Sequence, residues 1–210
     1  MNKRPIQVLL VDDHAVVRAG YSRLLKMADD ITVAGEADSG ERAYAACRET
    51  AFDVIVMDLS LPGMSGIEAT KRIHGRHPGV RVLVFSVHEE NIFVRRALAA
   101  GATGYISKRE VSDVLVDAVR CVARGERYIG ALLDADPDRG DINPLAQLSA
   151  REFEIFRLLA SGASIQAIAD ELFLSPKTVA NHTSRLRAKL GTQGTADLTR
   201  LAIRTGVVSL

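Results

Sequence analysis

The first 125 residues alternate short, mostly apolar runs with amphipathic stretches, and this rhythm constrains the fold more than any other feature. The apolar runs lie at 6–11, 31–37, 54–58, 80–86 and 103–107. Each is followed by a stretch whose apolar residues recur at helical spacing. The runs VLLV and VIVM lack polar alternation, as expected for strands buried on both faces. The pattern predicts an α/β domain with a doubly wound, parallel, five-stranded sheet.

Beyond Leu148 the apolar residues recur only at helical spacing. Ser149 and Glu152 have the spacing of a capping box, and Ser175 followed by proline predicts the start of a helix that ends before Gly191. We expect a small all-α domain of four helices. Within it, a tight turn at 173–174 would complete a helix-turn-helix.

A segment rich in Asp, Pro and Gly separates these parts and predicts a linker. We expect an α/β domain over 1–125, a linker over 126–145 and a helix-turn-helix domain over 146–210. The formal net charge of +1 excludes a uniformly basic nucleic-acid-binding protein, but it conceals a +3 helical domain beside a −3 linker. We expect four linker aspartates to compete with DNA for the basic surface: Asp134, Asp136, Asp138 and Asp141.

The sequence indicates neither a secretory nor a membrane protein. The apolar run after the basic start is too short for a signal peptide, and no apolar stretch approaches the roughly 18 residues of a membrane span. Cys47 and Cys121 lie far apart and match no metal or redox spacing. We therefore expect a cytoplasmic protein without membrane contact.

Three aspartates follow two of the predicted strands. Asp12 and Asp13 end the first run, and Asp58 ends the third. Ligands of an open parallel sheet bind beyond the carboxyl ends of its strands, and in the order 2-1-3-4-5 the first and third strands are neighbours. The three carboxylates would then converge and repel one another, which Mg²⁺ with its oxygen ligands would relieve. The alternative for each aspartate is a simple helix cap.

Ser86 and Lys108 end the fourth and fifth runs, so both are expected at the same edge of the sheet. The set contains what formation of an aspartyl phosphate requires. Asp58 would be the nucleophile, the cation and Lys108 would neutralise the phosphoryl oxygens, and Ser86 would donate a hydrogen bond to them.

Two groups of motifs resemble known families. VDDH at 11–14, MDLSLPGMSG at 57–66, FS at 85–86 and GYISK at 104–108 resemble the receiver domain of two-component response regulators. LSAREFEIFRLLASG and LFLSPKTVANHTSRLRAKL are similar to the DNA-binding domain that NarL/FixJ response regulators share with LuxR proteins. The combination resembles the NarL/FixJ family. It implies a flavodoxin-like domain phosphorylated by a sensor histidine kinase. It also implies a transcriptional regulator that binds inverted or tandem half-sites in double-stranded promoter DNA as an active homodimer.

The resemblance also implies roles for individual residues of the first domain. Asp58 matches the phosphoacceptor, Asp13 the carboxylate metal ligand and Asp12 the second acidic position. Ser60 matches the position whose backbone carbonyl binds the metal, which would be Mg²⁺.

Ser86 and Tyr105 match a switch pair, whose hydroxyl moves toward the phosphoryl group while the aromatic ring turns inward. A half-buried aromatic that never moves is the alternative for Tyr105. The chain departs from the family at Arg109, where a proline, often preceded by a cis bond, commonly follows the lysine. It departs again at Val87, where a smaller residue is frequent.

The helix expected over 176–190 has an apolar face and an opposite polar face, as a recognition helix in the major groove requires. The family's base-contacting positions match Ala180, Asn181 and Ser184. Phosphate contacts are expected from Lys177, Thr178, Arg185 and Lys189. A merely solvated helix face is the alternative.

The family's dimer surface matches the apolar face of the last helix, with Ala196, Leu198, Leu201 and Ala202. Packing inside the domain is the alternative for some of these residues. The chain departs from the family at 165–167 and at Gly194, and both departures remove backbone contacts to DNA. We therefore expect a modest affinity of the monomer and a strong need for dimerisation.

Two other classes of protein compete with a phosphorylation-gated regulator. An aspartate-nucleophile phosphohydrolase would generally carry a second aspartate two residues after the nucleophile, where this chain has Ser60. A ligand-sensing LuxR-type regulator would need a large apolar pocket, which the sequence does not indicate. We therefore expect no turnover enzyme, only self-catalysed phosphoryl acceptance and slow autodephosphorylation.

Overall fold

The chain divides into two compact units, Met1–Pro137 and Asp138–Leu210. The computed structural model describes residues 4–110, 112–133 and 144–208. The four linker aspartates lie outside these ranges, so their competition with DNA stays a prediction. The domain boundaries drawn from the sequence also stay predictions.

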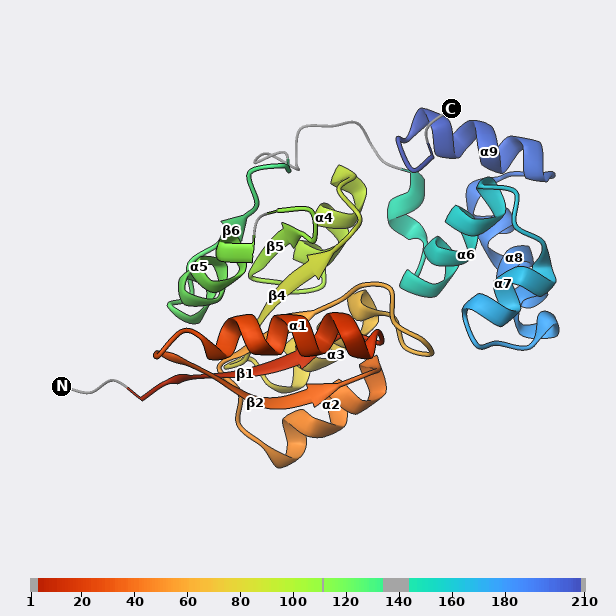
Figure 1. Ribbon diagram of the computed structural model, residues 1–210. Helices are drawn as coiled ribbons and strands as arrows, with labels where there is room; N and C mark the ends of the chain where they lie inside the picture. Colours follow the sequence, from red (N-terminus) through yellow and green to blue (C-terminus); the bar gives the residue numbers. More distant parts are fainter. Residues whose placement is uncertain (1–3, 111, 134–143, 209–210) are drawn as a thin grey trace. The chain divides into compact units, whose positions relative to one another are not determined.

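The first unit is a parallel sheet covered by helices on both faces (Figure 1). Its strands, in the spatial order β2-β1-β3-β4-β5-β6, are β1 (Ile6–Val11), β2 (Ile31–Ala37), β3 (Val54–Met57), β4 (Arg81–Ser86), β5 (Gly104–Ser107) and β6 (Tyr128–Ile129). The helices are α1 (Ala15–Lys26), α2 (Gly40–Glu49), α3 (Gly66–Arg76), α4 (Asn91–Ala99) and α5 (Ser112–Ala123). The doubly wound fold predicted from the sequence is confirmed.

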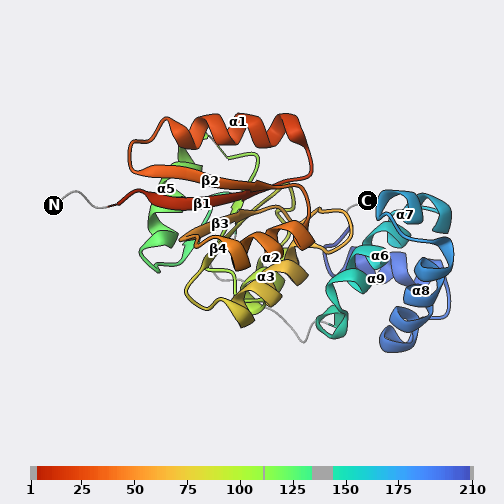
Figure 2. The ribbon, with the colours of Figure 1, turned by 90° about the horizontal axis from the view of Figure 1, so that it is seen from below.

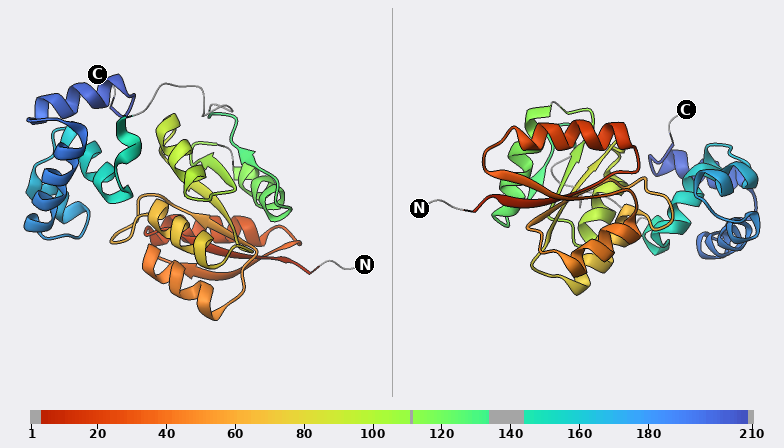
Figure 3. Two further views of the ribbon diagram at one scale, coloured as in Figure 1. Left: turned by 180° about the vertical axis from the view of Figure 1, so that it is seen from behind. Right: turned by 60° about the horizontal axis from the view of Figure 1, so that its bottom comes forward.

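The layering explains why the central strands have no polar alternation. Helices α1 and α5 lie on one face of the sheet, and α2 and α3 lie on the other (Figure 2). Figure 3 shows the same arrangement from another direction, with α1 and α2 on opposite sides of the strands. All four residues of β3 are buried, because both of its faces are covered.

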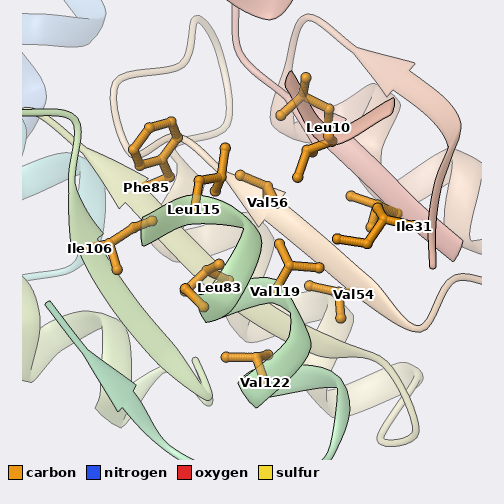
Figure 4. Close-up of a cluster of buried hydrophobic side chains, with 13 residues drawn as sticks. Leu10, Ile31, Val54, Val56, Leu83, Phe85, Ile106, Leu115, Val119 and Val122 are labelled. Atoms are coloured by element: carbon orange, nitrogen blue, oxygen red, sulfur yellow. The ribbon is translucent and has the colours of Figure 1, made fainter. Parts of the chain in front are cut away.

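The core between the sheet and α5 holds this unit together. Leu115, Val119 and Val122 of α5 project onto the strands, where they meet side chains such as Val54 and Leu83 (Figure 4). The thirteen buried residues of this cluster come from α1, α5 and five strands. The burial of these side chains holds the strands in place against α5, and this fixes where the carboxyl ends of the strands lie.

The number of strands was predicted wrongly, since the sheet has a sixth strand. Residues Tyr128 and Ile129 pair with Gly104 and Tyr105 of β5, in the segment that the sequence indicated as linker. A two-residue strand carries no periodicity that a sequence pattern could show. Its pairing depends instead on Gly104, where a Cβ would come within 2.8 Å of the Tyr128 carbonyl oxygen.

The described part of the second unit contains helices joined by short turns and no strand, as predicted. It consists of the 3₁₀ turn η1 (Pro144–Gln147) and the helices α6 (Ala150–Ala160), α7 (Ile165–Glu171), α8 (Pro176–Leu190) and α9 (Thr195–Arg204). The capping box at the start of α6 is present, with Ser149 and Glu152 each accepting the backbone N–H of the other. Gly191 ends α8 in the left-handed conformation, with φ at 64°. Of the described helices, none combines the length and apolar character needed to cross a membrane.

Candidate functional site

The carboxyl ends of four strands bring the predicted site residues together. Asp12 follows β1, Asp58 follows β3, Ser86 ends β4 and Lys108 follows β5. The strands are neighbours in the sheet, and the register pairs Val11 with Met57 at the end of β1 and β3. The convergence of these side chains follows from the topology, because parallel strands end at the same edge.

Lys108 joins two buried carboxylates. Its Nζ lies 2.7 Å from Asp12 Oδ2 and 2.7 Å from Asp58 Oδ2. Asp12 is 2% exposed and Asp58 4%, so these ion pairs are shielded from water. Burial lowers the pKa of Lys108, but the charges and hydrogen bonds of the two carboxylates outweigh it and raise the pKa overall. The ammonium therefore stays charged at neutral pH.

The second oxygen of Asp58 is held by the main chain. Asp58 Oδ1 accepts the N–H of Leu59 at 2.7 Å and the N–H of Ser60 at 3.4 Å. Gly66, at the start of α3, lies against this loop, because a Cβ there would overlap the Asp58 carbonyl oxygen. The carboxylate is thus oriented by the loop that follows β3, and a side chain at position 66 would displace it.

Asp12 also belongs to a second cluster of polar side chains, which it forms with Asp13 and His14. The ligand atoms of Asp12, Asp13 and His14 all lie within 4.8 Å of one another. Asp13 Oδ1 is buried and makes no hydrogen bond within the described residues, although His14 Nδ1 lies 2.7 Å away. An orphaned carboxylate oxygen next to a second carboxylate is a donor set that suits a hard divalent cation. The site therefore fits Mg²⁺.

The predicted metal ligands Asp58 and Ser60 do not belong to this group. Asp58 Oδ2 is paired with the Lys108 ammonium instead, which Asp58 shares with Asp12. The Ser60 hydroxyl lies 3.2 Å from His88 Nε2, so the side chain of this residue contacts the β4–α4 loop. Both residues remain proposed ligands, Ser60 through its backbone carbonyl.

The predicted switch pair is buried, and both members contact the main chain of His88. Ser86 Oγ accepts the His88 N–H at 3.3 Å, and the Tyr105 hydroxyl donates to the His88 carbonyl at 2.7 Å. Tyr105 is 0% exposed, so it is not half-buried. Burial raises the pKa of Tyr105 far above its usual value, which keeps the phenol protonated as a donor.

Sequence reasoning missed several residues around the site. Glu89 accepts a 2.6 Å hydrogen bond from the Ser107 hydroxyl, and Arg18 donates to the carbonyl of Asp12 at 2.6 Å. No spacing rule links positions 89 and 107, which only the sheet brings together. Gly66 did carry a signal, since a glycine directly after a helix-capping serine indicates close backbone packing.

The DNA-binding surface predicted on α8 is partly exposed. The side chains that face solvent are Lys177, Asn181, Ser184 and Arg185, whereas Thr178 and Ala180 are half-buried. Val179, Thr183 and Leu186 are buried on the opposite face, as the periodicity predicts. The helix therefore presents a polar face to solvent, and two of its exposed side chains, Lys177 and Arg185, are basic.

Lys189 differs from the other proposed phosphate contacts. Its ammonium lies 2.6 Å from Glu152 Oε2, and it also donates to the Gln147 carbonyl at 3.3 Å. The Gln147 side chain donates in turn to the Lys189 carbonyl at 2.6 Å. Lys189 thus fastens the end of α8 to the start of α6, and this role competes with a phosphate contact.

The proposed dimer surface on α9 needs correction. Leu198 and Ala202 are 0% exposed and Leu201 is 7% exposed, because α9 packs with its apolar face against α6. These three side chains form part of the core of the second unit. Ala196 alone is exposed, so the sequence alternative of packing inside the domain is correct for the other three. An amphipathic pattern does not distinguish a core-facing helix from an interface-facing one.

The fold and the site define a response regulator with a DNA-binding domain. The model of the response regulator receiver domain matches residues 8–120, and that of the luxR family of bacterial regulatory proteins matches residues 146–202. The chain belongs to the NarL/FixJ (LuxR) family of two-component response regulators. Its partners are accordingly a histidine kinase and DNA.

Individual relatives extend over nearly the whole chain. Response regulator UvrY of Escherichia coli strain K12 is 42% identical over 209 residues, which are 96% of this chain and 95% of that protein. Response regulator GacA of Pseudomonas viridiflava is 40% identical over 210 residues, covering 97% of this chain and 98% of that protein.

Solved structures share the fold. A two-component response regulator of the LuxR family from Aurantimonas sp. SI85-9A1 is 40% identical with a TM-score of 0.58, covering 59% of this chain and 89% of that chain. Response regulator RcsB of Salmonella typhimurium has a TM-score of 0.68 at 23% identity, covering 99% and 100%.

Proposed function

We propose that Asp58 accepts a phosphoryl group from a histidine kinase and that this event controls DNA binding by the second domain. The observation that carries the proposal is the Lys108 ammonium, which lies 2.7 Å from both of the buried carboxylates of Asp12 and Asp58. A lysine in this position neutralises charge where a phosphoryl group on Asp58 would add it. The same chain contains a helix-turn-helix, to which the charge change can be coupled.

Asp58 acts as the nucleophile in this reaction. One carboxylate oxygen forms the new O–P bond, and the bond from phosphorus to the donor breaks, so that the donor leaves with its electron pair. Asp12 and Asp13, together with Asp58 and the Ser60 carbonyl, would hold Mg²⁺, and the bound cation would supply positive charge to the phosphoryl oxygens. Lys108 pairs with the phosphoryl group. Without a recycling acid or base at position 60, the chain is phosphorylated once rather than turning substrate over.

Ser86 and Tyr105 transmit the change of charge on Asp58 to the β4–α4 loop. When Ser86 donates its hydroxyl hydrogen to the phosphoryl group, its contact with the His88 N–H weakens. Tyr105 holds the carbonyl of the same residue, so the β4–α4 loop is held from two sides. The loop therefore responds to the charge on Asp58, in the manner of a local electrostatic switch.

On DNA, α8 is the recognition helix. Asn181 reads adenine through its amide, with Ala180 and Ser184 against neighbouring bases, while Lys177 and Arg185 position the helix on phosphates with help from Thr178 and Lys189. RcsB has been solved in complex with DNA as two dimers on two parallel DNAs. By analogy, two phosphorylated copies of this chain bind adjacent half-sites, inverted or tandem.

The test compares wild type with Asp58→Asn in DNA-binding anisotropy. The DNA is selected from a random-sequence pool, and both proteins are measured with Mg²⁺, with and without acetyl phosphate. We expect at least about 10-fold tighter binding of the wild type after phosphorylation, equal to about 1.4 kcal/mol, and no change in Asp58→Asn. An equal gain in both proteins contradicts the proposal, and continuous release of phosphate points to a phosphohydrolase.

A further inference from the structure

The loop at 107–110 carries Lys108 and lines a small cavity. Its main chain is attached to the sheet through the Lys108 N–H, which donates to the Ser86 carbonyl at 2.8 Å. A cavity of about 80 Å³ lies under the loop and is lined by Tyr21, Phe85, Leu115 and Lys108 itself, among others. Hydrophobic contact alone therefore does not hold the lysine in place.

Polar contacts hold the loop on its other side. The Ser107 hydroxyl, which is 0% exposed, donates to Glu89 Oε1 at 2.6 Å. Ser107 Oγ in turn accepts the Arg109 N–H at 3.1 Å. A hydroxyl that donates to a carboxylate over so short a distance makes a charge-assisted hydrogen bond. On one side of Lys108, Ser107 is thus fixed to the Glu89 carboxylate, and on the other side the main chain of Arg109 is fixed to Ser107.

The ion pair between Arg109 and Glu89 contributes less to holding the loop than the hydrogen bond between Ser107 and Glu89. Its Nη1 lies 3.2 Å from Glu89 Oε2, but the Arg109 side chain is 74% exposed, and such surface pairs stabilise little. Its backbone N–H is the more important group. A residue without this N–H would leave the Ser107 oxygen with one hydrogen bond fewer.

We propose that Glu89 and Ser107 are positioning residues for Lys108. The inference rests on the proposed function, in which Lys108 pairs with the phosphoryl group on Asp58. Glu89 comes from the loop between β4 and α4 and Ser107 from the end of β5, so their hydrogen bond fastens the lysine loop to the switch loop. A displacement of about 1 Å in a catalytic group commonly costs about 100-fold in rate, so a hydrogen bond that limits the movement of Lys108 should affect the rate of phosphorylation.

The experiment measures phosphorylation of full-length protein by acetyl phosphate with Mg²⁺. The variants are Ser107→Ala, Glu89→Ala and Ser107→Thr, which keeps the hydroxyl. We expect the maximal rate to fall about 10-fold in the first two, with an unchanged acetyl phosphate concentration at half-maximal rate. Both variants should also melt at a lower temperature, because each loses a charge-assisted hydrogen bond, so the rates are compared well below the melting transition. Ser107→Thr should retain most of the rate. Glu68→Gln, which breaks an exposed ion pair with Arg72 on α3, is the matched control and should have no effect.

Each variant is repeated in a Lys108→Ala background. If Glu89 acts through the lysine, Glu89→Ala slows wild type but leaves the Lys108→Ala rate unchanged. An equal slowing in both backgrounds, or none in either, overturns the inference. The proposed function fails separately, if wild type is not phosphorylated at all or if Asp58→Asn is phosphorylated as fast.

Discussion

At the scale of the residue, the proposed phosphoacceptor site is a balance between two buried carboxylates and one lysine ammonium. Asp12 and Asp58 are almost fully buried and share the single ammonium of Lys108 within the described part of the site. Two buried carboxylates against one cation leave net negative charge, and Asp13 adds to it nearby. The site is therefore built to take up more positive charge, and stability should depend on whether a cation is present.

Lys108→Met tests this balance. Removing the ammonium leaves two carboxylates without a partner, which should lower the free energy of unfolding by about 3 kcal/mol without metal. Mg²⁺ should recover more of this loss in the variant than it adds to wild type, because it binds only the folded site. Urea unfolding followed by circular dichroism measures both values. Lys71→Met, an exposed lysine on α3, is the control, and an equal response of both variants to Mg²⁺ contradicts the prediction.

Gly66 offers a second test at this scale. A methyl group there would overlap the main chain of Asp58, and backbone moves less easily than a side chain. Gly66→Ala should therefore destabilise the protein by about 1–3 kcal/mol and slow phosphorylation. Gly75→Ala on the same helix meets nothing within 4 Å and should be neutral or slightly stabilising. Thermal melts of the two variants distinguish the close approach from a general effect of glycine in a helix.

At the scale of the element, short connections decide how the larger helices and strands are joined. Strand β6 has only two residues, but Gly130 after it donates its N–H to the Tyr105 carbonyl at 2.9 Å. Glu110 then accepts the Ala131 N–H at 3.3 Å and the Ser107 N–H at 3.3 Å. One carboxylate thus ties the segment after β6 to the end of β5.

Gly130→Ala should break this tie, because a Cβ there would overlap the Glu110 carboxylate. That carboxylate ends a flexible side chain, so we expect it to move away with little global destabilisation, under about 1 kcal/mol. Hydrogen exchange at 128–133 should become faster while exchange in β1 and β3 stays unchanged. Glu110→Gln, which keeps the shape, should accelerate it less. Unchanged exchange in Gly130→Ala contradicts the assignment.

In the second unit, Glu152 joins two helices. It completes the capping box of α6 and accepts the Lys189 ammonium from the end of α8, and it is 4% exposed. Glu152→Gln should destabilise this unit by about 1.5–3 kcal/mol, the usual range for a hydrogen bond to a charged group. Hydrogen exchange in α6 and α8 measures the effect. Glu154→Gln, which breaks an adjacent pair with Arg151, is the control and should cost less.

The same residue predicts a dependence on pH. Burial raises the pKa of Glu152, but the hydrogen bonds from Lys189 and Ser149 outweigh it and lower the pKa overall. The stabilisation is then complete above the ordinary glutamate pKa near 4.5 and disappears as pH falls through the lower folded value. The difference in stability between wild type and Glu152→Gln should shrink below pH 4.5. A difference that grows on acidification contradicts the assignment.

At the scale of the whole molecule, a near-zero net charge coexists with DNA binding because the basic residues are local. Lys177 and Arg185 are exposed on α8, whereas Lys189 is occupied by Glu152. Each subunit therefore has few free cations for phosphates on this helix. Affinity should come from pairing two subunits on one DNA rather than from strong binding of one.

The salt dependence of DNA binding tests which basic side chains of α8 contact DNA phosphates. Lys177→Ala and Arg185→Ala should each lower the slope of log affinity against log salt by about 1, equally for all sequences. Asn181→Ala should leave the slope unchanged and cost about 1–3 kcal/mol on the selected site only. Lys26→Ala, an exposed lysine on α1, is the control for loss of charge as such. An unchanged slope in both basic variants places the phosphate contacts elsewhere.

The sequence alone predicted most of the fold and the convergence of Asp12, Asp58 and Lys108 at one edge of the sheet. Apolar runs such as VLLV specify buried parallel strands, and strand ends in a parallel sheet share one edge, so Asp12, Asp58 and Lys108 had to converge. Capping signals such as Ser149 and Ser175 marked helix starts, because they act over three residues of chain. These inferences depend on patterns within short stretches of chain, which can be read from the sequence without the structure.

Only the tertiary structure decided which groups touch. It placed Lys108 between two carboxylates, joined Glu89 to Ser107, added β6 to the sheet and buried Leu198, Leu201 and Ala202 inside the second unit. The physical reason is the same in each case. An amphipathic or charged pattern states that a side chain needs a partner, whereas the identity of the partner depends on residues far along the chain that packing brings within a few ångströms.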